Sequence, residues 1–152
     1  MKRGLLERLN SDGVVCAEGY LFEMERRGYM TSGEFVPEVA LENPDALQIL
    51  HRDFQHAGSD VIEAFTYNAH REKMRVIDKE DLLEPLNRNA LRIAREVAAD
   101  VEEGQEPNLF AGNISNSNIW NPAEPKSQQQ VREMFEEMVG WAFDEGVDFI
   151  IG

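Results

Sequence analysis

Short, almost continuously apolar runs alternate along the chain with longer segments of helical periodicity. The apolar runs lie near residues 14–18, 60–66, 108–114 and 147–151. Each run follows a glycine, and these glycines are 45, 46 and 42 residues apart: Gly13, Gly58, Gly104 and Gly146. Runs without polar alternation are typical of parallel strands that are buried on both faces. The spacing leaves room for one loop and one helix after each strand.

Three of the intervening segments have the apolar spacing of amphipathic helices. The first, 43–57, has Pro44 at its first helical position, and Gly58 follows as the left-handed residue that ends a helix. The second spans about 82–101, and the third spans 127–145 and opens on a Ser-x-x-Gln capping box. Strands and helices that alternate in this way predict βαβ units, a parallel sheet and the α/β fold class.

The number of predicted units points to a larger architecture. Four βα units are half of the eight that close a (β/α)8 barrel. The run at 147–151 is the last segment of the sequence, whereas a buried parallel strand needs cover on both faces and neighbours on both edges. We therefore expect residues 1–152 to be one partial domain, the N-terminal half of a (β/α)8 TIM barrel. A complete four-stranded domain is the alternative.

Composition narrows the class of protein. The chain has 15 Lys+Arg against 29 Asp+Glu, and its net charge of −14 argues against a nucleic-acid groove, which needs a basic stripe. No apolar stretch reaches the ~18 residues of a membrane span, and the first residues lack the apolar centre of a secretory signal. The single cysteine, Cys16, allows no disulfide framework and no cysteine-cluster metal site within this chain. We expect a reducing, cytoplasmic setting.

The ends of the predicted strands carry the candidate chemistry, as in other α/β proteins. Glu18-Gly19 follows the first strand, where a carboxylate could hold an amine, although from the local pattern alone a plain turn into a helix at 21–27 is the simpler explanation. Glu63 interrupts the second apolar run, which is costly unless it is paired or faces a pocket. Tyr67-Asn68 follows, and the ring could face a cationic donor, with an exposed loop as the alternative.

The histidines and the cysteine suggest no metal site. His51 and His56 are five residues apart on one predicted helix and do not share a face, so we expect surface or capping roles for the histidines, including His70. Cys16 lies in an apolar run and is expected to be a buried structural thiol.

Five stretches, in order along the chain, resemble the homocysteine S-methyltransferase family, most closely its betaine–homocysteine branch. They are RGLLERL (3–9), AEGYLFEMERRGY (17–29), PEVALENPDALQILHRDFQHAGSDVIEAFTY (37–67), NRNALRIAREVA (87–98) and VDFIIG (147–152). The resemblance implies a (β/α)8 barrel in which three cysteine thiolates of the second half hold zinc. The zinc activates the homocysteine thiol, which attacks the methyl group of betaine or a similar donor and gives methionine.

The resemblance also assigns residues to the homocysteine side of the site. Glu18 and Gly19 match the acid–glycine pair that contacts homocysteine, although the family more often has Asp-Gly and the spacing differs by one residue. Glu63 and Thr66 fall at the strand end on the same side of the site. These residues would bind and orient the substrate, and none is expected to carry the chemical step.

A second group matches the pocket of the methyl donor. Phe35 and Tyr67 stand where the betaine enzymes have Trp and Phe, and Asn68 stands where they have Tyr. The expected partners are therefore homocysteine and a small methyl donor, either betaine or a compound like it.

The resemblance leads to one functional prediction and one alternative. We expect a methyltransferase whose zinc ligands lie outside these residues, so that the 152-residue chain alone gives no turnover. The alternative is a non-catalytic α/β half-barrel that binds a ligand or self-associates into a homo-oligomer, which would hide its open edges. Light scattering separates the two, because a stable dimer would support the alternative.

Overall fold

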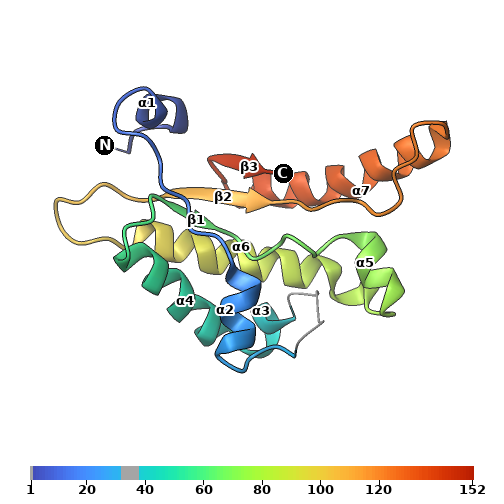
Figure 1. Ribbon diagram of the computed structural model, residues 1–152, viewed down its shortest axis with the longest axis horizontal. Coiled ribbons are helices and arrows are strands. Elements are labelled where there is room, and N and C mark those ends of the chain that lie inside the picture. The colour runs from blue at the N-terminus through green and yellow to red at the C-terminus, as the bar shows by residue number, and fades with distance from the viewer. Residues whose placement is uncertain (1, 32–37) are drawn as a thin grey trace.

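A small parallel sheet forms the centre of the computed structural model, which describes residues 2–31 and 38–152 (Figure 1). Its strands are β1 (Val61–Glu63), β2 (Leu109–Asn113) and β3 (Phe149–Ile151), in the order β1-β2-β3. Both pairs of neighbouring strands are parallel. The carboxyl ends of all three strands therefore meet at one edge of the sheet.

Helices provide the crossovers between the strands. The three longest are α4 (Pro44–His56), α6 (Leu83–Ala99) and α7 (Pro125–Asp144). The shorter ones are α1 (Leu5–Leu9), α2 (Tyr20–Arg26), α3 (Val39–Glu42), α5 (Arg71–Val76) and the 3₁₀ helix η1 (Glu80–Leu82). In Figure 1, α4 and α6 lie on one side of the sheet and α1 lies on the other. The expected α/β class with a parallel sheet is confirmed.

The two faces of the sheet have different surroundings because side chains alternate along each strand. On one face, Ile62 and Phe110 pack against α6 and α7 in a buried cluster. On the other face, Val61 and Leu109 pack against Leu5 of α1 and neighbouring residues. Helix α1 thus contributes to the cover of this second face. The last residue of β1, Glu63, lies on that same face.

The predicted first strand, 14–18, lies beside β1 but forms no regular strand. Cys16 makes a single parallel bridge to Val61. Next to it, the carboxylate of Asp60 accepts a hydrogen bond from the Val15 N–H at 2.8 Å, and the Asp60 N–H donates to the Val15 carbonyl at 2.7 Å. Since a side chain replaces one of the backbone acceptors, the segment is extended without a continuous ladder.

The ends of α4 and α7 can be compared with the start and stop signals that the sequence predicted. Helix α4 begins at Pro44 and is followed by Gly58 with φ of +101°, as predicted. Helix α7 begins at Pro125, before the predicted start at Ser127, so the capping box is wrong. The Ser127 hydroxyl instead accepts from the Asn121 N–H and donates to its carbonyl, both at 2.9 Å. The hydroxyl holds the preceding loop and caps no helix.

The outer side of α7 and its neighbourhood remain open in the described residues. Phe143 is 81% exposed, Trp120 56% and Val139 41%.

Throughout residues 2–31 and 38–152, we find no helix that combines the length and the apolar character needed to cross a membrane.

Candidate functional site

A pocket of about 640 Å³ opens where the carboxyl ends of the three strands meet α2 and α5. Five of the residues singled out in the sequence line it: Glu18, Gly19, Glu63, Tyr67 and Asn68. They come from two separate stretches of chain, 18–19 and 63–68, and the fold brings them to one cavity. This is the place where α/β proteins with parallel strands bind their ligands.

Two carboxyl groups form the acidic part of the pocket. Glu63 ends β1 and is only 6% exposed. Burial, together with the nearby charge of Glu18, raises the pKa of the Glu63 carboxyl from 4.5 to about 7. The Cys16 thiol donates a long hydrogen bond of 3.8 Å to Glu63 Oε2. A buried carboxyl group whose ionisation is disfavoured by burial and by a neighbouring acid is a place where a bound cation is stabilised.

The turn between the first extended segment and α2 brings the backbone to the pocket. Gly19 has φ of +82°, a left-handed conformation that suits glycine, and it is the N-cap residue of α2. Its carbonyl accepts from the Glu23 N–H at 3.0 Å, as expected for the first turn of a helix. A ligand can approach this backbone because Gly19 lines the pocket and a Cβ atom built there would meet no atom within 4 Å.

Tyr20, which sequence reasoning missed, links the pocket to the helical layer. Its hydroxyl lies 3.4 Å from the Glu63 N–H nitrogen and 3.4 Å from Nδ1 of His51. The hydroxyl accepts from the Glu63 N–H and shares a second hydrogen bond with Nδ1 of His51, in which the tautomer of the ring decides the donor. The tyrosine is one of many aromatic residues with helical spacing, so no local signal distinguished it.

His51 is fully buried, so the expectation of a surface or capping role was wrong for it. Burial lowers the pKa of its imidazole to about 3, which keeps the ring neutral. Its Nε2 has no hydrogen-bond partner among the described residues. His56 is exposed, and His70 caps α5 by accepting from the Lys73 N–H at 3.4 Å, so the expectation is confirmed for both.

The α5 side of the pocket carries a cation that the sequence did not reveal. Lys73 Nζ donates to Asn68 Oδ1 and lies 5.8 Å from the centroid of the Tyr67 ring. Burial lowers the pKa of this lysine. Nε2 of His70 lies 3.2 Å from the Asn116 carbonyl, which ties the α5 end to the loop after β2. The pocket therefore has acids at β1 and a lysine at α5.

The remaining expected residues lie elsewhere. Thr66 is buried beside the pocket without lining it, and its hydroxyl donates to the Asn113 carbonyl at 2.7 Å. The Asn113 N–H donates back to the same hydroxyl at 3.2 Å. Thr66 thus fastens the loop after β1 to the end of β2. Phe35 lies outside the described residues.

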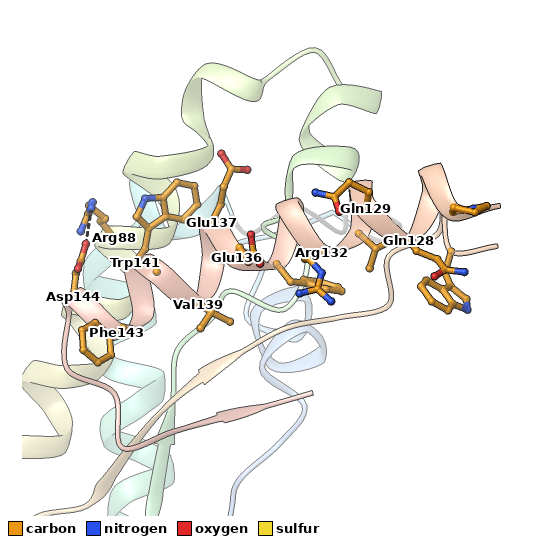
Figure 2. Close-up of a pocket in the computed structure, with 15 residues that line it drawn as sticks. Arg88, Gln128, Gln129, Arg132, Glu136, Glu137, Val139, Trp141, Phe143 and Asp144 are labelled. Carbon is orange, nitrogen blue, oxygen red and sulfur yellow. Dashed lines mark hydrogen bonds and ion pairs between the residues drawn. The ribbon is translucent and has the colours of Figure 1, made fainter. Parts of the chain in front are cut away.

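A larger hollow, of about 1110 Å³, lies along the outer side of α7. Figure 2 shows its lining side chains, which project mainly from that one helix, and the Arg88–Asp144 ion pair at one end, with a distance of 3.3 Å. The hollow is shallow, and the carboxylates of Glu137 and Asp144 are engaged by arginines. It lacks the converging, unpaired acids of the smaller pocket, which we take as the candidate site.

The described residues do not fit a zinc site. No group of three or more His, Cys, Asp or Glu side chains in these parts of the chain is arranged to hold a metal ion. Burial, with Glu63 and Glu18 nearby, raises the pKa of the Cys16 thiol to about 11. Cys16 is therefore a single protonated thiol, and the sequence offers no second cysteine beside it.

Comparison with known proteins supports the resemblance seen in the sequence. The family model described as homocysteine S-methyltransferase matches residues 15–152. The chain is 36% identical to betaine–homocysteine S-methyltransferase 1 of Sus scrofa. The matched region covers 99% of this chain and 53% of that protein. It is equally similar, at 36%, to the S-methylmethionine–homocysteine S-methyltransferase of Pongo abelii, over 99% of this chain and 38% of the relative.

The solved structures agree on the fold. The homocysteine methyltransferase MmuM from Escherichia coli, in its oxidized form, superposes with a TM-score of 0.74 at 18% identity. The match covers 97% of this chain and 56% of that one, and a metallated form matches equally well. The chain thus spans between about a third and about half of the length of these relatives. The family model matches nearly the whole sequence, so the chain belongs to the homocysteine S-methyltransferase family.

Proposed function

We propose that residues 1–152 form the N-terminal half of the (β/α)8 barrel of a homocysteine S-methyltransferase. The whole enzyme would transfer a methyl group from betaine or a similar donor to the thiol of homocysteine and release methionine. The match to just over half of the MmuM chain supports this arrangement. So do the exposed apolar side chains of α7, such as Phe143, which the rest of the barrel would cover.

The main support for the proposal is the pair of acids in the pocket, Glu18 and Glu63. Homocysteine has an ammonium group, and Glu18 and Glu63 offer it two carboxyl groups in one pocket. Because the pKa of Glu63 is raised by burial and by Glu18, an ammonium between them lowers the cost of ionising Glu63. Gly19 lets the substrate approach the backbone. Thr66 holds the strand ends in register through Asn113.

The methyl donor would lie on the side of Tyr67 and Asn68, and the family resemblance alone assigns Phe35 to the donor. Tyr67 is 47% exposed and lines the cavity, so part of its ring is available to a ligand. Relatives that use betaine and relatives that use S-methylmethionine, by their names, are equally similar to this chain. Both donors carry a positive centre that an aromatic ring can attract.

In this family, zinc would convert the homocysteine thiol to a thiolate when bound. The residues described here would bind and orient the substrates without holding that ion, since no three His, Cys, Asp or Glu side chains among them are arranged to hold a metal. The ligands would come from the rest of the enzyme. The enzyme would work in the cytoplasm, and we expect no methionine from the 152-residue chain alone.

The test has two measurements on the same purified chain. Homocysteine binding, followed by calorimetry, should weaken by about 10-fold or more in Glu63→Gln and in Glu18→Gln, since each removes a charged partner of the ammonium. Glu7→Gln, at an exposed acid of α1, is the matched control and should bind as the unchanged chain does. Mass spectrometry should detect no methionine when homocysteine, betaine and zinc are added. Unchanged binding in both pocket variants, or methionine formation by the chain alone, would contradict the proposal.

A further inference from the structure

Lys73 differs from the other basic side chains in this acidic chain. Most described lysines and arginines form ion pairs with the numerous carboxylates. The described ones without an ion pair are otherwise exposed at the surface: Arg92, Lys126 and Arg132. Lys73 is half-buried, and among the described residues no carboxylate lies within ion-pair distance of it.

The structure holds this lysine at the pocket. Its backbone N–H is fixed by the capping side chain of His70, and its Nζ is directed to Asn68 Oδ1 beside the Tyr67 ring. Asn68 is a neutral partner, so the charge of the lysine is not balanced. Desolvation of an unbalanced ammonium is costly, and an anion in the pocket would offset that cost.

The same cavity contains the acid pair. Glu18 and Glu63 line it from the α2 and β1 side, whereas Lys73 and Asn68 line it from the α5 side. The cavity has two acids on one side and a lysine without an ion pair on the other. It therefore complements a molecule that carries one positive and one negative group. A purely cationic ligand would leave the lysine unbalanced.

We infer that Lys73 binds the carboxylate of a zwitterionic substrate whose positive nitrogen lies toward Glu18 and Glu63. The inference rests on the proposed function, since it concerns the same pocket. Two substrates have the required chemistry: homocysteine, an α-amino acid, and a betaine-type methyl donor. Lys73 is a specificity-determining residue in this account, and Asn68 positions its ammonium group.

Two pairs of ligands isolate the contribution of the carboxylate. Homocysteine is compared with 3-aminopropane-1-thiol, which lacks the carboxylate, and glycine betaine is compared with choline, in which a hydroxymethyl group replaces it. Each is titrated calorimetrically onto the 152-residue chain and onto Lys73→Met. In at least one pair, the unchanged chain should prefer the carboxylate ligand by about 10- to 100-fold, the range expected for a charged hydrogen bond.

Lys73→Met should abolish that preference by weakening the binding of the carboxylate ligand, without weakening the binding of the cation that lacks a carboxylate. Lys126→Met, at an exposed lysine of α7 that does not line the pocket, is the matched control and should keep the preference. The pair that loses its preference identifies which substrate Lys73 serves. Equal weakening of both members of each pair would show a structural role only and would overturn the inference.

The result also separates this inference from the proposed function. If homocysteine fails to bind while betaine binds with a Lys73-dependent preference over choline, the proposed homocysteine site is wrong and the role of Lys73 stands. If homocysteine binds as proposed but Lys73→Met changes neither pair, the role of Lys73 is wrong and the proposed function stands. Binding of no zwitterion by the unchanged chain would overturn both. Thermal unfolding of Lys73→Met, monitored by circular dichroism, verifies that the variant is folded.

Discussion

The Sγ atom of Cys16 lies 3.8 Å from Oε2 of Glu63, and the carboxyl group helps to keep the thiol protonated. Burial, followed by the charge of Glu63, raises the pKa of the thiol to about 11. Burial and the charge of Glu18 raise the pKa of the carboxyl to about 7. A bridge between the first extended segment and β1 brings the two residues together.

The reactivity of Cys16 tests this relationship directly, because the chain has one thiol. In Glu63→Gln the charge near the sulfur is lost, so the thiol pKa should fall and alkylation by iodoacetamide at pH 8 should become several-fold faster. Mass spectrometry measures the rate. Glu7→Gln, which removes an exposed acid from α1, should react as slowly as the unchanged chain. Equal rates in all three proteins would show that Glu63 does not influence the thiol.

The pH dependence of stability provides a second test. The Glu63 pKa is higher in the folded chain than in the unfolded one, so the folded state holds a proton between pH 4.5 and about 7 that the unfolded state has lost. The free energy of unfolding should therefore fall as pH rises through this range, by about 2–3 kcal/mol. Glu63→Gln should lack this fall. Urea unfolding at pH 5 and pH 8 measures it, and parallel curves for the two proteins would contradict the prediction.

His51 should make the opposite contribution. Its folded-state pKa is about 3, against an ordinary value of 6.5, so below pH 6.5 the unfolded chain takes up a proton that the folded chain does not. Stability should therefore fall as pH falls from 6.5 toward 3. His51→Phe should weaken this acid dependence, whereas His56→Gln, at the exposed end of α4, should leave it unchanged. Urea unfolding at pH 7 and pH 5 compares them, and an unaltered slope in His51→Phe would refute the assignment.

Gly112 of β2 lies where neighbouring side chains leave little room for a Cβ atom. A Cβ atom there would lie 2.8 Å from Ile150 Cδ1 and 3.3 Å from Ala142 Cβ, so neighbours on β3 and α7 would have to move. We expect Gly112→Ala to lower the free energy of unfolding by about 1–3 kcal/mol. Gly140→Ala, in α7, meets no atom within 4 Å and should raise it by about 0.5–1 kcal/mol. Urea unfolding measures both, and a neutral Gly112→Ala would contradict the packing described.

The sequence predicted those features that depend on local chemistry. Pro44 and Gly58 mark α4 because proline suits the first helical turn and glycine suits the left-handed residue after it. The interruption of an apolar run by Glu63 correctly indicated a pocket, since such an acid needs a partner or a cavity. The predicted sites at Glu18 and Gly19 line the same cavity, although their roles stay predictions.

The features that it missed depend on contacts between distant segments. Lys73 enters the pocket because His70 and Asn68 fix the start of α5, and nothing in its own neighbourhood distinguishes it from an exposed lysine. Tyr20 matters through its contacts with Glu63 and His51, which are far away in sequence. Helical spacing shows that a side chain is buried but does not identify its polar neighbour.

Proton release on homocysteine binding tests whether Glu18 and Glu63 receive the ammonium group of homocysteine. At pH 6, Glu63 is mostly protonated, and a bound ammonium should favour its carboxylate form. Calorimetric titration in two buffers with different ionisation enthalpies should show release of up to about one proton by the unchanged chain and none by Glu63→Gln. Affinity should rise with pH up to about 7 in the unchanged chain only. Homocysteine binding with no proton release, or with the same release in Glu63→Gln, would contradict the account.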